Sequence, residues 1–301
     1  MSRVTGERYL SPLRYPGGKG RLGQFVAEII ATQPRRASRY VEPFAGGAGV
    51  GLSLLYHEHV DEIVLNDVDA GVAAFWRALF EQPDELIELV RNASVTIDEW
   101  HRQRAIHQDR PDDDLQFGFA TFFLNRTNRS GILDSRPIGG LGQTGKWLID
   151  ARYDGDRLAE RMRRLASFAT RVSISSEDGV DVVSRELQVE GTFIYADPPY
   201  LQKGDDLYLD TLQWEDHQRL AAVLGDATGW FLTYDHDPRV LRLYPHLRCA
   251  SFGIAHTAGV QHVGSEYAVF ARDLILPPLH NLGHRARLIG RRSIRQPAIP
   301  S

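Results

Sequence analysis

The hydrophobic positions of the chain gather in five short apolar runs, each of which stops at a polar or glycine-rich corner. The runs cover residues 39–44, 63–65, 192–196, 230–234 and 266–271. Each has the length of a β-strand and contains β-branched or aromatic residues, which favour the extended conformation. The pattern therefore predicts five strands.

Segments with helical spacing lie between these runs. Apolar side chains recur on one face of the segments 49–56, 72–80 and 214–224. Strands that alternate with helices are typical of an α/β domain built on a mainly parallel sheet. We expect this sheet to be formed by residues 1–91 and 172–276 together.

The stretch from 92 to 171 interrupts that alternation. Its helical pieces, at 117–123 and 158–168, are joined by a glycine-rich loop at 138–145. We interpret residues 92–171 as a small, mainly helical domain inserted between strands of the sheet. The Arg-rich segment 277–301 has few apolar residues, and we expect it to be a poorly ordered tail.

Composition narrows the class of protein. The chain has 301 residues, of which 43% are hydrophobic and 25% charged, as in ordinary globular proteins. It has no apolar run near the ~18 residues that a membrane span needs, and its first sixteen residues hold no leader-like apolar stretch. With Cys249 as its single cysteine, it forms no intrachain disulfide, so we expect a cytoplasmic protein with Cys249 buried as a small apolar side chain.

The charge is uneven along the chain. The net charge is −4, yet residues 126–171 hold ten Lys/Arg against five Asp/Glu. A locally basic surface on an acidic protein is compatible with phosphate binding, and an ordinary solvated surface explains the same count. The histidines lack the spacing of metal ligands, and we expect no metal site.

A glycine-rich turn follows the first predicted strand, with the sequence VEPFAGGAG at 41–49. Such a turn lets a ligand approach the backbone at the start of a helix, although the glycine spacing does not match the dinucleotide-binding fingerprint. The second strand ends at Asp67, about twenty residues after the glycines. An acid at that position accepts hydrogen bonds from ribose hydroxyls in doubly wound sheets.

The most specific pattern is DPPY at 197–200, directly after an apolar strand. Consecutive prolines fix the backbone and remove donors, so the carbonyls of Asp197 and Pro198 are left free to accept hydrogen bonds. With the Asp197 carboxylate they suit a planar amino group, while Tyr200 offers a face for a base to stack on. Asp197, Pro198, Pro199 and Tyr200 are therefore the candidate catalytic residues.

The order of these pieces resembles that of the Dam-type, α-group adenine-specific DNA methyltransferases. The resemblance covers roughly residues 11–271. It includes SPLRYPGGKGRL at 11–22, EPFAGGAG at 42–49, Asp67, FFLNR at 122–126 with Ser130 and Gly131, and DPPY at 197–200. It implies a Rossmann-like S-adenosylmethionine methyltransferase sheet with an inserted target-recognition domain.

The resemblance also implies roles for residues. Those expected beside S-adenosylmethionine are Tyr15, where the family more often has Trp, Lys19, Glu42, Phe44, Gly46, Gly47, Asp67, Asp178 and Asp197. Those expected to contact DNA are Asn125, Arg126, Arg129, Arg136, Lys146 and Arg152.

The reaction implied is methyl transfer to the N6 amino group of an adenine flipped out of duplex DNA. The residues alone leave two alternative functions open. One is an enzyme of the same architecture that acts on RNA or a protein amide, and the other is an inactive DNA-binding relative. The partner expected is DNA, and a cognate restriction or defence partner fits the family.

Overall fold

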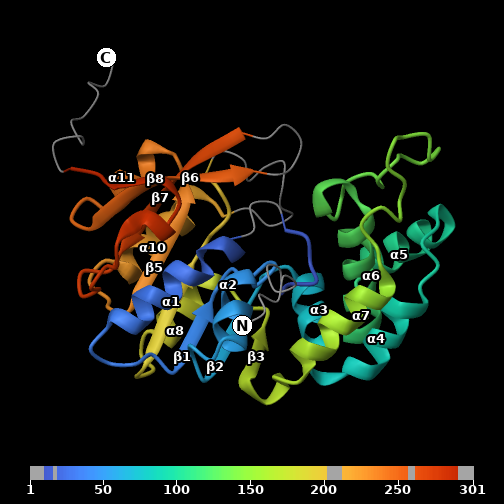
Figure 1. Cartoon of the computed structure of the whole chain (residues 1–301), viewed down its shortest axis with the longest axis horizontal. Helices are drawn as coiled ribbons and strands as arrows, with labels where there is room; N and C mark the ends of the chain where they lie inside the picture. Colours follow the sequence, from blue (N-terminus) through green and yellow to red (C-terminus); the bar gives the residue numbers. More distant parts are fainter. Residues whose placement is uncertain (1–9, 16–18, 202–211, 257–261, 291–301) are drawn as a thin grey trace, which may run out of the picture.

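The sheet that the apolar runs predict is larger than five strands. The computed structural model describes residues 10–15, 19–201, 212–256 and 262–290. In that part of the chain eight strands form one sheet (Figure 1). The strands are β1 (Arg39–Glu42), β2 (Glu62–Asn66), β3 (Val172–Ser175), β4 (Thr192–Ala196), β5 (Trp230–Asp235), β6 (Arg248–His256), β7 (His262–Phe270) and β8 (His284–Leu288).

The strand order is β3-β2-β1-β4-β5-β7-β6-β8. The first five strands in that order run parallel, whereas β7, β6 and β8 join by antiparallel pairing. The chain steps outward in one direction from β1 and in the other from β4. Because the order reverses between β1 and β4, the loops that follow these two strands flank the place where doubly wound sheets bind ligands.

Burial explains why the sequences of the central strands are continuous apolar runs. Val41 of β1 lies opposite Val64 of β2 and Ile194 of β4, and all three side chains are buried. Helices cover both faces of a parallel sheet, so alternation with polar residues is lost there. The α/β fold expected from the sequence is confirmed.

The described residues also contain ten α-helices. They are α1 (Gly23–Thr32), α2 (Gly49–Tyr56), α3 (Ala70–Glu81), α4 (Pro83–Asn92), α5 (Ile97–Asp109), α6 (Asp114–Thr127), α7 (Gly155–Ala166), α8 (Gly179–Glu186), α10 (Trp214–Leu224) and α11 (Pro238–Leu243). Right-handed crossovers place α2 and α3 on one face and α8 and α10 on the other. In agreement, α8 packs against α10 and α1 against α2.

Helices α3 to α7 gather at one side of the sheet (Figure 1). Helix α6 packs against α3, α4 and α5, and its Phe119, Phe122 and Phe123 are buried among them. The segment between β2 and β3 is therefore mainly helical. The boundaries at 92 and 171 stay a prediction, and α4, which ends at the first of them, packs against α7.

The expectation that the tail begins at 277 is wrong for its first part. Residues 284–288 form β8, which pairs with β6 at the edge of the sheet. Leu282 is buried just before this strand. The hydrophobic pattern does not predict β8. Most of its side chains are exposed, so the segment has few apolar residues. Residues 291–301 lie outside the described part of the chain.

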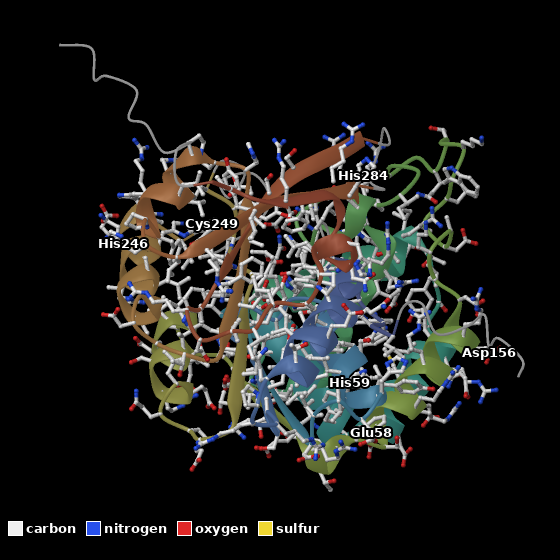
Figure 2. All side chains as sticks on the ribbon, turned by 60° about the vertical axis from the view of Figure 1, so that its left-hand side comes forward. Glu58, His59, Asp156, His246, Cys249 and His284 are labelled. Carbon is white, nitrogen blue, oxygen red and sulfur yellow. The ribbon has the colours of Figure 1, made fainter. Side chains whose placement is uncertain are left out.

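Cys249 lies on β6, where Figure 2 labels it, and its side chain is buried as expected. Burial raises the pKa of its thiol to about 11. The thiolate that makes cysteine reactive is therefore scarce near neutral pH. Across the described residues, none of the helices combines the length and the apolar character that crossing a bilayer would require.

Candidate active site

The polar residues singled out in the sequence meet at one edge of the sheet. The loops after β1, β2, β3 and β4 all leave from the carboxyl ends of parallel strands. They carry, in that order, the glycine turn, Asp67, Asp178 and the tetrapeptide that starts at Asp197. The parallel topology thus brings together motifs that are separated by about 150 residues of sequence.

The glycine turn after β1 is held by the end of β2. The N–H of Gly46 donates to Asp67 Oδ2 at 2.7 Å, and Trp76 Nε1 donates to the Gly46 carbonyl at 3.0 Å. Asp67 Oδ1 accepts the N–H of Asp69 at 3.0 Å. Both carboxylate oxygens of Asp67 are therefore engaged in positioning the loops at this edge of the sheet.

Tyr15 lies directly over this turn. A Cβ added at Gly46 would be 2.7 Å from the Tyr15 ring, and one at Gly47 would be 3.2 Å from Tyr15 Cβ. Gly46 also has φ +45°, a left-handed conformation that favours glycine. Residues 16–18 of the same sequence box lie outside the described residues. Tyr15 therefore packs on the two glycines, and its role beside a cofactor stays a prediction.

The loop after β1 also meets the start of α8. The Phe44 ring lies so close to Gly179 that any Cβ there would overlap it. Asp178 caps this helix, since its Oδ1 accepts the N–H groups of Val180 and Asp181, and its Oδ2 pairs with Arg219. Burial acts to raise the pKa of Asp178, but these hydrogen bonds and Arg219 lower it overall. Asp178 thus has a structural role whichever ligand binds nearby.

Asn66 was not singled out from the sequence, yet it ties three loops together. Its Nδ2 donates to the carbonyls of Pro43 and Glu177, and its Oδ1 accepts from Ser175 Oγ and from the Glu177 N–H. The side chain is fully buried. The sequence feature that could have identified Asn66 is that it is a polar residue at the last position of a buried strand.

The Glu42 side chain reaches the first turn of α2. Its Oε1 accepts the N–H of Gly51 at 2.6 Å and the hydroxyl of Tyr40 at 3.0 Å, so it fixes the start of α2. Burial, together with the nearby charge of Asp197, raises the pKa of the Glu42 carboxyl to about 8, against the hydrogen bonds that lower it. The role beside a cofactor stays a prediction.

The pKa of Glu42 predicts a pH-dependent stability. Above pH 4.5 the unfolded chain loses this proton while the folded chain keeps it, so the free energy of unfolding falls as the pH rises to about 8. Glu42→Gln removes the titration. We expect the melting temperature of the variant, measured relative to that of the wild type, to be several degrees higher at pH 8.5 than at pH 5. A difference that is the same at both pH values would contradict the raised pKa.

The most deeply buried ionic group of the site surrounds Lys19. Its Nζ lies 3.2 Å from Asp197 Oδ1, 2.9 Å from Glu266 Oε2 and 3.0 Å from the Tyr200 hydroxyl. The Tyr200 hydroxyl in turn donates to Glu266 Oε1 at 2.7 Å. The side chains of Lys19 and Glu266 are only 4% and 2% exposed, whereas that of Asp197 is 23% exposed.

Charge balance sets the protonation of this group. Burial alone would lower the pKa of Lys19, but the carboxylates of Asp197 and Glu266 outweigh it and raise that pKa well above its usual value. Lys19 is therefore a permanent cation at neutral pH. Burial also raises the pKa of Tyr200, so its hydroxyl stays neutral and donates.

Asp197 is fixed through one of its two oxygens. Oδ1 accepts from Thr233 Oγ1 at 2.6 Å and pairs with Lys19, while Oδ2 has no partner among the described residues. The carbonyl oxygens of Asp197 and Pro198 likewise accept no hydrogen bond from any described residue. The arrangement can accept two hydrogen bonds from a flat amine and stabilise positive charge on it.

The expected DNA-contacting residues divide into two groups. Asn125 is buried and bonds both backbone groups of Arg14, with its Oδ1 accepting at 2.7 Å and its Nδ2 donating at 2.8 Å. Arg126 is half-buried and donates to the carbonyls of Pro12 and Arg152. These two side chains position the N-terminal segment that carries Tyr15. The exposed group comprises Arg129, Arg136, Lys146 and Arg152.

Arg14, Arg126, Arg152 and Arg161 cluster where the N-terminal segment meets the helical region. Burial lowers the pKa of Arg126 to about 9, and the neighbouring charges of Arg14, Arg161 and Arg152 act in the same direction. No described carboxylate lies within ion-pair distance of these four side chains. Sequence reasoning missed Arg14 and Arg161, because their neighbours come from segments more than 100 residues away. The cluster is suited to an anion.

Comparison with known proteins identifies the same family that the motifs resemble. The family described as "D12 class N6 adenine-specific DNA methyltransferase" matches residues 15–230.

Named relatives are more distant. The chain is 22% identical over 204 residues to the type II methyltransferase M.MjaIII of Methanocaldococcus jannaschii, a match that covers 62% of this chain and 68% of that protein. It is 24% identical over 204 residues to modification methylase StsI of Streptococcus sanguinis, covering 64% of this chain but 28% of StsI. Identity to M.CviBI of Paramecium bursaria Chlorella virus NC1A is 22% over 212 residues, covering 69% and 76%.

Among solved structures, the rRNA methyltransferase aviRa from Streptomyces viridochromogenes aligns with 90% of this chain and 94% of its own. The TM-score is 0.40 and the sequence identity is 14%.

Proposed function

The chain belongs to the D12 class N6 adenine-specific DNA methyltransferase family, and from this membership we propose that S-adenosylmethionine is its methyl donor and Asp197 its catalytic residue. DNA is the substrate of the family. The observation that carries the proposal is the Asp197 carboxylate, which is held through Oδ1, while Oδ2 and the Pro198 carbonyl have no hydrogen-bond partner among the described residues.

The glycine turn supports a seat for S-adenosylmethionine. Gly46 and Gly47 let the Tyr15 ring pack directly against the backbone of the turn, and the Asp67 carboxylate beside them is of the type that binds ribose hydroxyls in doubly wound sheets. Phe44 and Glu42 border the same turn. We propose that Tyr15, Phe44, Gly46, Gly47 and Asp67 hold the cofactor, with Glu42 and Asp178 supporting the loops from beneath.

Replacing Gly46 tests this seat. Gly46→Ala would drive a Cβ into the Tyr15 ring, and we expect its affinity for S-adenosylmethionine to fall about tenfold or more, the scale of one lost buried contact plus left-handed strain. Calorimetric titration measures the effect. Gly140→Ala is the matched control, since Gly140 has φ +73° but open space around its Cβ position. Equal affinities for wild type and Gly46→Ala would contradict the assignment.

The proposed chemistry rests on hydrogen-bond acceptors. The amino lone pair of adenine is delocalised into the ring and is a poor nucleophile. Hydrogen bonds from the amine to Asp197 Oδ2 and the Pro198 carbonyl favour a tetrahedral nitrogen and stabilise the positive charge that develops on it. When bound, S-adenosylmethionine supplies a methyl group on a sulfonium centre. The amine then loses a proton to Asp197 or to water.

The surrounding residues fix that geometry. Lys19 and Thr233 hold Asp197 Oδ1, and Glu266 holds Lys19 and Tyr200. One side of the Tyr200 ring faces Lys19 Nζ, 5.1 Å from the ring centroid. We propose that the adenine is flipped out of the duplex and stacks on the other side of this ring, because the amine is out of reach inside the base stack.

The exposed basic residues of the insert support DNA binding. Arg129, Arg136, Lys146 and Arg152 form no ion pair with a carboxylate in the described part of the chain, so they remain available to phosphates or base edges. Because relatives are named type II methyltransferases and a modification methylase, we propose a role in restriction-modification with a cognate endonuclease. A cytoplasmic site of action fits the single, buried Cys249.

Methyl transfer by the purified chain tests the proposal. The chain is incubated with methyl-labelled S-adenosylmethionine and unmethylated plasmid DNA, and the DNA is digested to nucleosides. We expect the label to appear in N6-methyldeoxyadenosine alone. Label in methylated cytosine, or transfer to RNA but not to DNA, would contradict it.

A further inference from the structure

The residue that follows the candidate catalytic tetrapeptide is held at both polar groups of its backbone. Leu201 lies in a turn beyond the end of β4 and is half-buried. Its N–H donates to Asp235 Oδ1 at 3.2 Å, and its carbonyl accepts from Arg239 Nη2 at 3.3 Å. Backbone groups outside a sheet need partners of this kind, and hydrogen bonds to charged groups are the stronger ones. Asp235 and Arg239 therefore form a clamp on Leu201.

Strand β5, the parallel neighbour of β4, supplies one half of this clamp. The two strands pair with Ala196 opposite Leu232. Thr233 and Asp235 are two positions apart on β5, so their side chains lie on the same face of the strand. Thr233 Oγ1 donates to Asp197 Oδ1 at 2.6 Å, whereas Asp235 accepts the N–H that follows the tetrapeptide. One strand thus holds both ends of the segment 197–200.

A buried carboxylate fixes the other half of the clamp. Asp237, whose side chain is 5% exposed, accepts from Arg239 Nε at 3.0 Å and from Arg239 Nη2 at 2.7 Å. The same carboxylate caps α11, since its Oδ1 accepts the Arg239 N–H at 2.8 Å. The Asp237 N–H also donates to the Asp235 carbonyl at 2.8 Å. The two clamp residues are therefore joined through Asp237 in one hydrogen-bonded turn.

The clamp bears on the ring of Tyr200, because Leu201 directly follows that residue. The Tyr200 hydroxyl accepts from Lys19 Nζ at 3.0 Å and donates to Glu266 Oε1 at 2.7 Å. The ring is thus held by its hydroxyl at one end and by the next peptide group at the other. An aromatic ring with a fixed plane is a suitable platform for a stacked base.

We propose that Asp235 and Arg239 are positioning residues that keep the Tyr200 ring in the orientation on which the extruded adenine stacks. The inference rests on the proposed function of the site. Both residues act through the backbone of Leu201 and not on the reacting atoms. A displacement of about 1 Å at a reacting group lowers a rate by up to about 100-fold, so a tilted platform slows methyl transfer while the substrates stay bound.

Removing the acceptor at Asp235 tests the clamp. Transfer is followed in a single turnover with labelled S-adenosylmethionine and plasmid DNA. For Asp235→Ala we expect the rate to fall about tenfold or more, because the Tyr200 ring loses its fixed orientation. The affinities for S-adenosylmethionine and for DNA should stay near the wild-type values. Asp235→Asn keeps an oxygen that accepts the Leu201 N–H, so it should recover most of the rate.

A double variant shows whether the clamp acts through Tyr200. In Tyr200→Ala the ring is absent, so adding Asp235→Ala should slow the transfer no further. Two residues that act independently would instead multiply their effects. Amide hydrogen exchange reports on the contact itself, and the Leu201 N–H should exchange faster in Asp235→Ala than in the wild type.

A second pair of variants addresses the other half of the clamp. Arg239→Met frees the Leu201 carbonyl and should also slow the transfer. Arg242→Met is its matched control, since Arg242 is exposed on the same helix α11 and its loss should leave the rate unchanged. All rates are compared at a temperature at which melting curves show every variant folded.

Four results would overturn the proposal. The first is a wild-type rate in both Asp235→Ala and Arg239→Met. The second is a loss of affinity for S-adenosylmethionine or DNA as large as the loss of rate. The third is an Asp235→Asn variant as slow as Asp235→Ala, and the fourth is a further loss when Asp235→Ala is added to Tyr200→Ala. Failure of the proposed function is distinguishable, because the wild type would then methylate no DNA while exchange of the Leu201 N–H still reports on the clamp.

Discussion

Asp197→Ala is expected to lower turnover about 100-fold or more while leaving the affinity for DNA largely intact. The variant removes the acceptor proposed to stabilise positive charge on the adenine amine, and loss of one preorganised polar group has this scale of effect. The fold should survive, because Lys19 stays paired with Glu266 at 2.9 Å. Single-turnover methyl transfer measures the rate, and a DNA titration measures the affinity.

Two further variants sharpen this result. Asp197→Asn places an amide N–H where Asp197 Oδ2 is proposed to accept a hydrogen bond from the adenine amine, so it should be as inactive as Asp197→Ala. Asp181→Ala removes an exposed carboxylate from α8, at the same edge of the sheet, and should retain wild-type turnover. Full activity of Asp197→Asn would mean that a carboxylate is not needed, and the proposed mechanism would be abandoned.

Lys19→Met is expected to destabilise the protein by about 3–5 kcal/mol, since removing one partner of a buried ion pair leaves the other charge uncompensated. Glu266 would keep only the Tyr200 hydroxyl as a partner from the group around Lys19. Asp197 would also lose one of the two groups that hold its Oδ1. Both stability and turnover should therefore fall. Chemical denaturation and methyl transfer measure the two effects.

Paired variants separate the two effects of Lys19→Met. Adding Glu266→Gln removes the uncompensated charge, so the double variant should recover part of the lost stability without recovering turnover. Arg36→Met breaks the exposed pair between Arg36 and Asp61 and should cost at most about 1 kcal/mol. If Lys19→Met proved as stable as Arg36→Met, the buried ionic group would not hold the site together.

The sequence predicts the middle of the sheet better than its edge. The runs at 192–196 and 230–234 are buried on both faces, so their strands β4 and β5 were found nearly to the residue. Strand β8 at the edge is mostly exposed and has no such pattern. Strand β6 also escaped prediction, because its antiparallel pairing with β7 depends on a partner that the local pattern does not reveal.

The candidate site shows the same limit. The sequence predicts that the glycine turn, Asp67 and Asp197 lie close together, because parallel strands end at one edge of the sheet. It does not predict the place of Glu266, since this residue contacts Lys19 across 247 residues and stands in an apolar run that fits any strand. Asn125 was expected to contact DNA, yet its side chain is buried and forms hydrogen bonds with the backbone of Arg14, 111 residues away. Contacts between distant segments decide which polar side chains remain exposed.

The central claim is that this chain methylates adenine in DNA and that Asp197 carries the reaction. Single-molecule sequencing of DNA from a methylase-free host expressing the wild type or Asp197→Ala tests both parts in one experiment. We expect N6-methyladenine at one recurring sequence motif with the wild type and unmodified DNA with Asp197→Ala. Unmodified DNA from cells that contain the folded wild type, or the same methylated motif with Asp197→Ala, would contradict the claim.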